Sequence, residues 1–319
     1  MKAIVVSQFG APEVLEYKEI PQPTVQKDSV LIRVKAAGVN PVDTYIRAGS
    51  FGYQNNLPFI PGIDGAGVVE EVGEEVTKCY KGQRVFFQGV MGSYAEYIVC
   101  PESHVFELPQ HITFAQGAAI GSPYATAYHA LFQLAAAQAG QSVLVHGASG
   151  GVGIAALQWA KSYGLNVLAT AGSPKGREII MNMGIKEVFN HNEEGYVEQI
   201  LSYTKNQGLE IILEMLANKN LGKDLSLVAR YGKIVIIGSR GSIEINPRNI
   251  LRKEAKLIGV NLFLATADQR KSIFSAIEAG LKSGILLPII RTEIPLEKAS
   301  LAHELIMQPG AAGKIVLIM

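Results

Sequence analysis

The sequence predicts an α/β protein of two domains, one a partly open β-barrel and the other a doubly wound parallel sheet. Three observations predict this fold class. Short strand-like segments separated by turn residues fill the first third of the chain, and strand-like and helix-like segments alternate after about residue 118. A chain of 319 residues that is 48% hydrophobic also exceeds what one ordinary core holds.

Residues 1–117 are expected to form the barrel-like domain. Glycine, proline and aspartate mark the turns between its strand-like segments AIVV, SVLIRVKAAGV, GAGVVEEVG and GQRVFF. No long helical pattern interrupts them. The segment therefore suits a partly open β-barrel.

Residues 118–262 are expected to form the parallel sheet. Its strands read SVLVH, NVLAT, EVFN, EIILEM, GKIVIIG and KLIGV, with helices predicted over 152–163, 174–183, 196–204 and 221–229. Apolar runs joined by helical spacers indicate parallel strands buried on both faces, because only crossover connections join parallel neighbours. Residues 263–319 add a helix over 269–283 and a last strand, KIVLIM, and we expect them to return to the first domain.

Composition and charge favour small, neutral partners. The formal net charge of +1 gives no whole-protein field for nucleic acid or an anionic membrane. Two cysteines cannot build a disulfide framework, and no basic-then-apolar leader precedes MKAIVV, so a cytoplasmic location is expected. No apolar run approaches the ~18 residues that a membrane span requires.

The stretch VLVHGASGGVG at residues 143–153 lies where the first strand of the predicted sheet turns into its first helix. At such a turn, backbone N–H groups and the positive end of the helix dipole face outward, and glycines let a pyrophosphate approach. GASGGVG departs from the usual G-x-G-x-x-G spacing, and glycine turns also form only to pack a helix on a strand. The flanking strand and helix favour a dinucleotide site.

The residues after the second strand indicate which dinucleotide binds. NAD sites place an acid about 20 residues beyond the first glycines to hold the ribose 2′-hydroxyl. Here NVLAT is followed by a segment without a carboxylate, which contains Gly172, Ser173, Lys175 and Arg177. These groups suit a 2′-phosphate, so NADPH is favoured over NADH. The alternative is that Lys175 and Arg177 are solvated charges on the first turn of a helix.

Several further motifs run through the chain, namely AAGVNPVDTYIRAG, LPFIPGIDGAGVVEEVG, GSYAEY, QGAAIGSPYATAYHAL, EVFNH, EMLANKNL, IVIIGSRGSIEINPR and GAAGKIVLIM. With VLVHGASGGVG they give the whole chain a resemblance to the zinc-independent NADPH:quinone oxidoreductases of ζ-crystallin type, in the medium-chain dehydrogenase/reductase superfamily. The resemblance implies a GroES-like catalytic domain, a Rossmann NADPH-binding domain and a cleft between them where nicotinamide meets substrate.

The resemblance also implies roles for individual residues. Pyrophosphate contacts are assigned to Ser149, Gly150, Gly151 and Val152, and the adenosine ribose phosphate to Gly172 and Lys175. Tyr45 matches a tyrosine beside the nicotinamide, and the rest of the cofactor groove is lined by His191, Asn220, Ile237, Gly238, Ser239 and Arg240.

The residues themselves support these roles unequally. Arg240 follows a buried strand, at the edge of the sheet where ligands bind in open α/β folds, but it also suits an exposed turn. His191 follows the strand EVFN, and a histidine there can be satisfied within a turn. Asp43 is a conceivable base, although a carboxylate soon after proline is more often a turn former.

The sequence predicts no zinc site. Zinc-dependent relatives carry a Gly-His-Glu element and clustered cysteines, whereas this chain has Ile63 in the position of the histidine and only the isolated Cys79 and Cys100. Alcohol oxidation needs a Lewis acid, but a quinone or enone accepts electron density on its own oxygens. Hydrogen bonds to the developing oxyanion then suffice, and the candidate donors are Tyr45, Asn40 and Thr126.

Three function classes follow. The first is NADPH-dependent quinone reduction; the resemblance implies ortho-quinones, reduced in some relatives by one-electron steps, and a dedicated proton donor is then not required. The second is an NADPH-dependent enone or alkenal reductase on the same scaffold. The third is non-enzymatic, since ζ-crystallin-type proteins also serve as lens structural proteins and bind AU-rich RNA, although this chain has no RNA module or basic stripe. The family also implies a homodimer or homotetramer.

Overall fold

The computed structural model describes all 319 residues and divides them into two compact units. Unit 1 comprises Met1–Ser122, Leu287–Pro309 and Gly313–Met319, and unit 2 comprises Pro123–Leu286 and Gly310–Ala312. None of the helices combines the length and the apolar character that crossing a bilayer would require.

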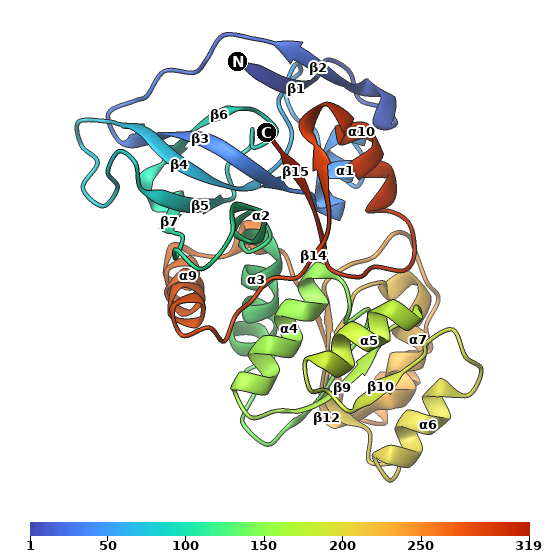
Figure 1. Cartoon of the computed structure of the whole chain (residues 1–319). Coiled ribbons are helices and arrows are strands. Elements are labelled where there is room, and N and C mark those ends of the chain that lie inside the picture. Colours follow the sequence, from blue (N-terminus) through green and yellow to red (C-terminus); the bar gives the residue numbers. More distant parts are fainter. The chain divides into compact units, whose positions relative to one another are not determined.

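Unit 1 is built mainly from antiparallel strands (Figure 1). One sheet runs in the order β14-β15-β3-β4-β5-β7, with β6 paired to β3, and its strands are β3 Ser29–Gly38, β4 Asp64–Val72, β5 Arg84–Gln88, β6 Tyr97–Pro101, β7 Val105–Glu107, β14 Ile290–Pro295 and β15 Lys314–Ile318. A separate hairpin pairs β1 Lys2–Val6 with β2 Leu15–Glu19. Its helices are α1 Pro41–Ala48, α2 Phe114–Ala118 and α10 Ala299–Leu305.

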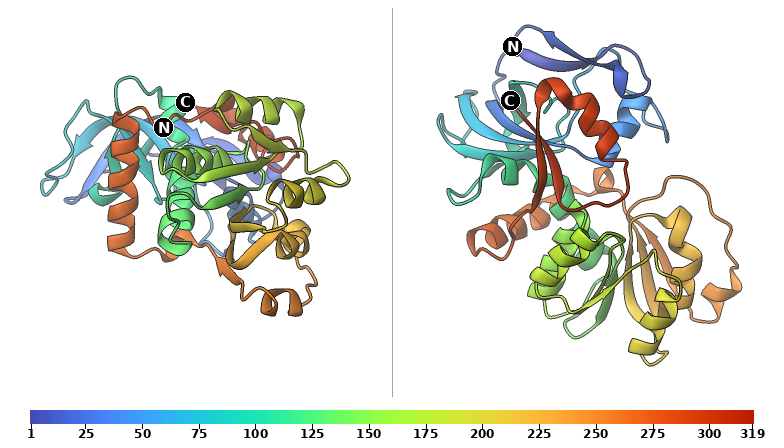
Figure 2. Two further views of the ribbon diagram at one scale, coloured as in Figure 1. Left: turned by 90° about the horizontal axis from the view of Figure 1, so that it is seen from below. Right: turned by 45° about the vertical axis from the view of Figure 1, so that its right-hand side comes forward.

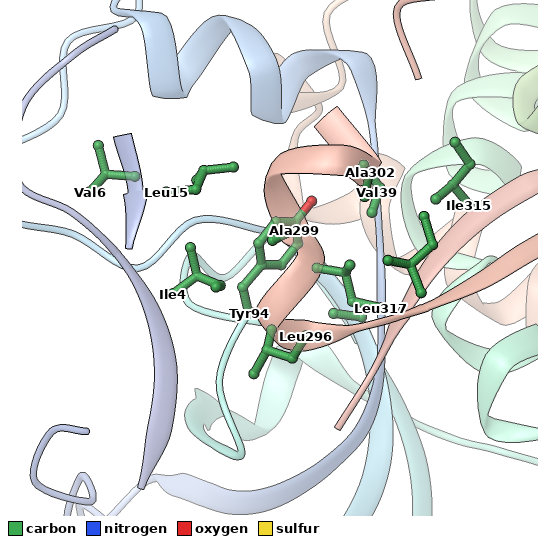
Figure 3. Packing of buried hydrophobic residues seen from close by; sticks show 12 residues of the cluster. Ile4, Val6, Leu15, Val39, Tyr94, Leu296, Ala299, Ala302, Ile315 and Leu317 are labelled. Carbon is green, nitrogen blue, oxygen red and sulfur yellow. The ribbon is translucent and has the colours of Figure 1, made fainter. Parts of the chain in front are cut away.

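The core of unit 1 joins segments from both ends of the chain. Figure 3 shows Tyr94, with no exposed side-chain surface, among apolar residues of the N-terminal hairpin and the C-terminal tail. Leu296 and Ala302 of the tail pack in the same cluster as Ile4 and Val6. Burial of this shared apolar surface explains why the last residues return to the first unit.

Unit 2 has a six-stranded parallel sheet in the order β10-β9-β8-β11-β12-β13. In chain order this is 3-2-1-4-5-6, the arrangement of a Rossmann fold, as predicted. Its strands are β8 Ser142–Val145, β9 Asn166–Thr170, β10 Glu187–Phe189, β11 Leu209–Glu214, β12 Val228–Ile236 and β13 Lys256–Gly259. Its helices are α3 Gly121–Tyr128, which starts at the end of unit 1, α4 Gly151–Ser162, α5 Pro174–Asn182, α6 Tyr196–Tyr203, α7 Ala217–Leu227, α8 Arg248–Leu251 and α9 Ala267–Lys282. Helices α4 and α7 cover opposite faces of the sheet (Figures 1 and 2).

The segment expected to return to the first domain is shorter than 263–319. Helix α9 belongs to unit 2, and the return begins at Leu287. The helix buries Ile273, Phe274 and Ile277, and the backbone carbonyl of Gln269 accepts a 3.1 Å hydrogen bond from Nε2 of Gln133. The first boundary likewise lies at Ser122 and not at residue 117, because α2, which ends at Ala118, packs against the sheet of unit 1.

Candidate functional site

The glycine stretch forms the turn between β8 and α4 in unit 2. Gly147 has φ +55°, a left-handed conformation that favours glycine, and the N–H of Gly150 donates to the carbonyl of Gly147 at 3.0 Å. The N–H of Ala148 donates to the backbone carbonyl of Thr170 at 2.9 Å, which joins the turn to the end of β9. The turn therefore lies at the carboxyl edge of the sheet, where strand order reverses between β8 and β11.

Two later glycines of the stretch have different surroundings. A Cβ at Gly153 would lie 2.5 Å from the Cα of Ala148, so this glycine lets α4 pack against its own turn. A Cβ at Gly150 would lie 3.4 Å from the nearest atom, the carbonyl oxygen of Gly147, which is ordinary contact. Packing therefore requires a glycine at position 153, whereas at position 150 the protein itself leaves room for a Cβ.

The first turn of α4 fits an anionic group. Gly150 is the N-cap and provides no side-chain cap, and the N–H groups of Gly151 and Val152 belong to the turn that has no intrahelical acceptors. Helix dipole and backbone donors together suit a pyrophosphate there. The Ser149 hydroxyl is engaged differently, since it donates to the carbonyl of Ala311 at 2.6 Å.

The end of β9 leads into α5, whose N-cap is Ser173. Its Oγ accepts from the N–H of Gly176 at 3.1 Å, so the hydroxyl proton is left for another acceptor. Lys175 is exposed on the first turn of the same helix. Arg177 instead donates from Nη1 to the backbone carbonyls of Ala171 and Gly172, at 3.4 and 3.3 Å. Ser173 and Lys175 thus each have an N–H or O–H donor that no described contact engages, while Arg177 holds the end of the strand.

Gly172 brings two side chains close to this corner. A Cβ there would lie 2.5 Å from Nδ2 of Asn192 and 2.7 Å from Nε2 of His191. The space beside the missing side chain is therefore filled by these two residues and is not open to a ligand. His191 thus lies against Gly172, with its Nδ1 3.2 Å from the hydroxyl oxygen of Thr170.

Asn220 of α7 lies over the end of β11. Its Nδ2 donates to Oε1 of Glu214 at 3.1 Å, and the N–H of Leu216 donates to the same oxygen. The side-chain amide of Asn220 therefore uses one of its N–H donors on Glu214.

The turn after β12 is tied to the turn after β11. The N–H of Ile237 donates to the carbonyl of Glu214 at 2.8 Å, and the carbonyl of Gly238 accepts from the N–H of Ala217 at 2.9 Å. The N–H of Arg240 donates to Oδ1 of Asn218 at 2.9 Å, and Ser239 lies between them at the exposed edge. The predicted groove residues 237–240 thus stand next to the start of α7.

A buried polar cluster that we did not predict lies under the glycine turn. His146, Thr170, Glu214 and Asp224 are each at most 2% exposed. Burial raises the pKa of both Glu214 and Asp224 to about 7, and it lowers the pKa of His146. The sequence signal was a polar residue at or just after the end of three apolar strands, VLVH, NVLAT and IILE, which are neighbours in the sheet. Such positions face the ligand edge of a doubly wound sheet.

Helix α1 of unit 1 carries Tyr45. Asn40 and Asp43 form a capping box at its start, and Gly49 ends it with φ +63°. The half-buried Tyr45 ring meets the Phe51 ring edge-on, with centroids 4.9 Å apart. Asp43 has no exposed surface, so its observed contacts are those of the turn former and not those of an accessible base.

A directional hydrogen-bond chain anchors the buried face of α1. Nη1 of Arg47 donates to Nδ1 of His303 at 3.3 Å, which leaves the proton of a neutral imidazole on Nε2. Nε2 lies 3.2 Å from the hydroxyl of Tyr94, and this hydroxyl donates to Oδ2 of Asp43 at 3.2 Å. Burial and Arg47 lower the pKa of His303 to about 3, and burial raises that of Asp43 to about 7.

The other two donor candidates are placed differently. Both ends of the Asn40 amide are occupied, because Nζ of Lys314 donates to Oδ1 and Nδ2 donates to Oδ2 of Asp64 at 2.9 Å. Thr126 is half-buried on α3, in unit 2. Of the three candidates, Tyr45 is the one in unit 1 whose polar group is not engaged by a described hydrogen bond.

An apolar side chain occupies the position to which the resemblance assigns the zinc-ligand histidine of metal-dependent relatives. Ile63 is 3% exposed, and the next residue, Asp64, accepts from Asn40 and from the hydroxyl of Ser122 at 2.8 Å. Burial raises the pKa of the Cys79 thiol to about 11, which disfavours the thiolate that binds metals.

Comparison with known proteins identifies the family. A family described as alcohol dehydrogenase GroES-like domain matches residues 26–110, and one described as zinc-binding dehydrogenase matches residues 151–278. A human protein named quinone oxidoreductase is 48% identical over 322 residues, which cover 100% of this chain and 98% of the human protein. The chain belongs to the quinone oxidoreductase family of the medium-chain dehydrogenase/reductase superfamily. It is therefore an oxidoreductase.

Solved members of the wider superfamily share the fold. A quinone oxidoreductase from Pseudomonas syringae has a TM-score of 0.87 at 29% identity, covering 100% of this chain and 99% of that chain. A mycobacterial protein solved in complex with NADPH has a TM-score of 0.91 at 26% identity, covering 100% of both chains. The predicted fold class, a Rossmann domain with a GroES-like domain, is thus confirmed.

Proposed function

We propose that this protein reduces quinones with NADPH as the electron donor and without zinc. The observation that carries the proposal is full-length likeness at 48% identity to a protein named quinone oxidoreductase. Ortho-quinones are the acceptor class that the family resemblance favours. The enone or alkenal reductase remains the alternative for the experiment to reject.

The described residues of unit 2 fit NADPH. The N–H groups of Gly151 and Val152 would hold the pyrophosphate, and the Ser173 hydroxyl with the Lys175 ammonium would hold the 2′-phosphate. No carboxylate lies between Thr170 and Arg177 to repel that phosphate. When bound, the reduced nicotinamide supplies a hydride to the acceptor. One proton, from solvent or from a side chain, then completes the hydroquinone.

In unit 1, Tyr45 is the hydrogen-bond donor to the quinone. Its phenol donates a hydrogen bond to an oxygen that gains negative charge, which is strongest where the donor is already in place. The capping box and the Arg47–His303–Tyr94–Asp43 chain fix the helix that carries it. Because a quinone takes electron density on its own oxygens, this donor replaces a Lewis acid.

Initial rates with 9,10-phenanthrenequinone and with a conjugated alkenal, each with NADPH, test the proposal. We expect turnover of the quinone and at least tenfold lower kcat/KM for the alkenal, a difference of about 1.4 kcal/mol in the barrier. The reverse order would establish the alkenal reductase. Tyr45→Phe, with Tyr80→Phe at an exposed position of unit 1 as the matched control, shows whether the phenol contributes, since loss of kcat in the first variant alone assigns the hydrogen bond to Tyr45.

A further inference from the structure

A row of polar side chains follows the carboxyl ends of neighbouring strands in unit 2. Along the order β10-β9-β8 these residues are His191, Thr170 and His146. The Thr170 hydroxyl oxygen lies 3.2 Å from Nδ1 of His191 and 3.1 Å from Nδ1 of His146. Asp224 of α7 ends the row, with Oδ1 2.9 Å from Nε2 of His146. A hydrogen-bonded connection thus runs from the buried interior to the half-buried His191.

Thr170 couples the two histidines. Its hydroxyl oxygen also accepts from the N–H of Gly147 at 3.4 Å, so one lone pair and one proton are left, and the hydroxyl accepts from one imidazole and donates to the other. Burial lowers the pKa of both His146 and His191, so each ring is neutral and carries one N–H. A proton on Nδ1 of one histidine therefore requires its absence from Nδ1 of the other.

The two buried carboxyl groups decide which histidine donates. Oε1 of Glu214 accepts from the N–H of Leu216 and from Nδ2 of Asn220, and two such donors stabilise the ionised form. Asp224 contacts Nε2 of His146 through Oδ1 and receives no such N–H donors, and Oδ2 of Asp224 and Oε2 of Glu214 both lack a hydrogen-bond partner. Ionising both carboxyl groups with no exposed surface would be costly, so the proton belongs on Asp224.

We propose that Asp224, His146 and Thr170 are positioning residues that fix the tautomer of His191. Asp224 donates to Nε2 of His146, and Nδ1–H of His146 donates to the Thr170 hydroxyl. The hydroxyl in turn donates to Nδ1 of His191. His191 then carries its proton on Nε2.

This tautomer matters for cofactor choice. Nε2 of His191 lies where a Cβ on Gly172 would be 2.7 Å away, next to the helix that begins with Ser173 and Lys175. A protonated Nε2 adds a donor to a corner suited to an anionic phosphate, whereas a bare Nε2 would repel it. The inference rests on the proposed NADPH function and assigns part of its specificity to residues that do not touch the cofactor.

Nitrogen-15 NMR of the histidine rings tests the tautomer without any cofactor. Thr170→Val removes the hydroxyl at nearly constant volume, and Thr170→Ser keeps it. We expect His191 to be protonated on Nε2 in the wild type, in Thr170→Ser and in Asp224→Asn, whose amide still donates to His146. Thr170→Val should show a mixture of tautomers. Protonation on Nδ1 in the wild type, or an unchanged His191 in Thr170→Val, would overturn the proposal.

Dissociation constants for NADPH and NADH test the consequence. Thr170→Val should reduce the NADPH preference by about threefold to tenfold, less than the loss of a whole hydrogen bond to a charged group, because a mixture of tautomers keeps part of the donor, and Thr170→Ser should retain the preference. In a His191→Ala background, Thr170→Val should have no further effect on that ratio. An equal effect in both backgrounds would mean that Thr170 acts by another route and would overturn the proposal. Wild-type protein that binds no NADPH would instead defeat the proposed function, while the NMR result would still stand.

Metal analysis of the purified protein tests the alternative that the buried cluster binds a metal ion. The ligand atoms of His146, Glu214 and Asp224 lie within 4.8 Å of one another. A stoichiometric divalent cation there would displace the proton from Asp224 and overturn the proposal. A metal-free protein with unchanged ring nitrogen signals after added Zn²⁺ supports it.

Discussion

The hydroxyl of Ser149 donates a 2.6 Å hydrogen bond to the backbone carbonyl of Ala311, in the short segment Gly310–Ala312 that belongs to unit 2. The side chain that the resemblance assigns to the pyrophosphate is therefore engaged within the protein. At this position only the backbone of Ser149 is left to contact a ligand, and the hydroxyl stabilises the turn.

Ser149→Ala should lower the free energy of unfolding by about 1 kcal/mol, the typical net contribution of one such hydrogen bond. NADPH affinity should stay within about threefold of the wild type. Urea unfolding and fluorescence titration measure the two. Ser162→Ala is the matched control, because Ser162 donates to a backbone carbonyl at the far end of α4. A tenfold loss of affinity in Ser149→Ala alone would show that the hydroxyl leaves Ala311 for the cofactor.

The sequence predicted unit 2 well because each of its strands is an apolar run bounded by turn residues. NVLAT and EVFN became β9 and β10 within one residue. Helix α7 begins at Ala217 and not at Leu221, since its first turn, ANKN, is polar and lacks the apolar spacing that marks a helix. Helices α2 and α3 were missed for a different reason: they are rich in small residues that bury almost every face.

The site was only partly predictable. Backbone positions such as Gly150 follow from the turn between a strand and a helix, which the sequence marks locally. The tie between Ser149 and Ala311 joins residues 162 positions apart, and that between Thr170 and His146 spans 24. No local pattern encodes such pairings, because they depend on strand order and on how the tail returns.

The acid side of the stability curve should depend on Asp43 and His303 in opposite ways. His303 has a folded pKa of about 3, below its ordinary 6.5, so the unfolded state binds more protons between these values and stability falls as the pH falls. Asp43 has a folded pKa of about 7, above its ordinary 3.8, so the folded state binds more protons there and stability falls as the pH rises.

The free energy of unfolding at pH 6.5 minus that at pH 4.5 measures this balance. His303→Gln should lower the difference and Asp43→Asn should raise it, each by up to about 2.7 kcal/mol over the two pH units. Urea titrations at both pH values give the numbers. Shifts of the same sign in the two variants would contradict the assigned protonation states.

Activity should not depend on zinc. Ile63 is buried where the metal-dependent relatives have a histidine, and burial raises the pKa of the Cys79 thiol to about 11. Purified protein should contain far less than one zinc per chain and keep full quinone reductase activity after dialysis against EDTA. Stoichiometric zinc with turnover that the chelator abolishes would reject this expectation. A zinc-dependent alcohol dehydrogenase treated in parallel shows that the dialysis removes metal.

NADPH should bind at least tenfold more tightly than NADH, a difference of about 1.4 kcal/mol. Lys175→Glu should remove most of this preference, because it places a negative charge beside Ser173, where the phosphate is expected. Lys186→Glu is the matched control, since this exposed lysine lies just before β10, at the amino ends of the strands and not at their carboxyl ends. Fluorescence titration gives the four dissociation constants. An unchanged ratio in Lys175→Glu would transfer the role to His191 or Arg240.

The glycine turn offers the sharpest separation of binding from packing. Gly150 has φ −80° and room for a Cβ, so Gly150→Ala should fold normally while its methyl group obstructs the pyrophosphate. We expect NADPH affinity to fall more than tenfold, about 1.4 kcal/mol, with little change in the thermal midpoint. Gly153→Ala should do the reverse: its Cβ would lie 2.5 Å from the Cα of Ala148, so it should lose about 1–3 kcal/mol of stability.

Gly222→Ala is the control for generic glycine effects, because this exposed position in α7 has nothing within 4 Å of a Cβ. It should keep its affinity and gain up to about 1 kcal/mol of stability from helix propensity. Gly164, at the end of α4, cannot serve this purpose, since its φ of +77° would strain an alanine. Calorimetry and fluorescence titration on the three variants separate the effects. If Gly150→Ala binds NADPH normally but melts several degrees lower, the glycine serves packing, and the N-terminus of α4 is not the pyrophosphate site.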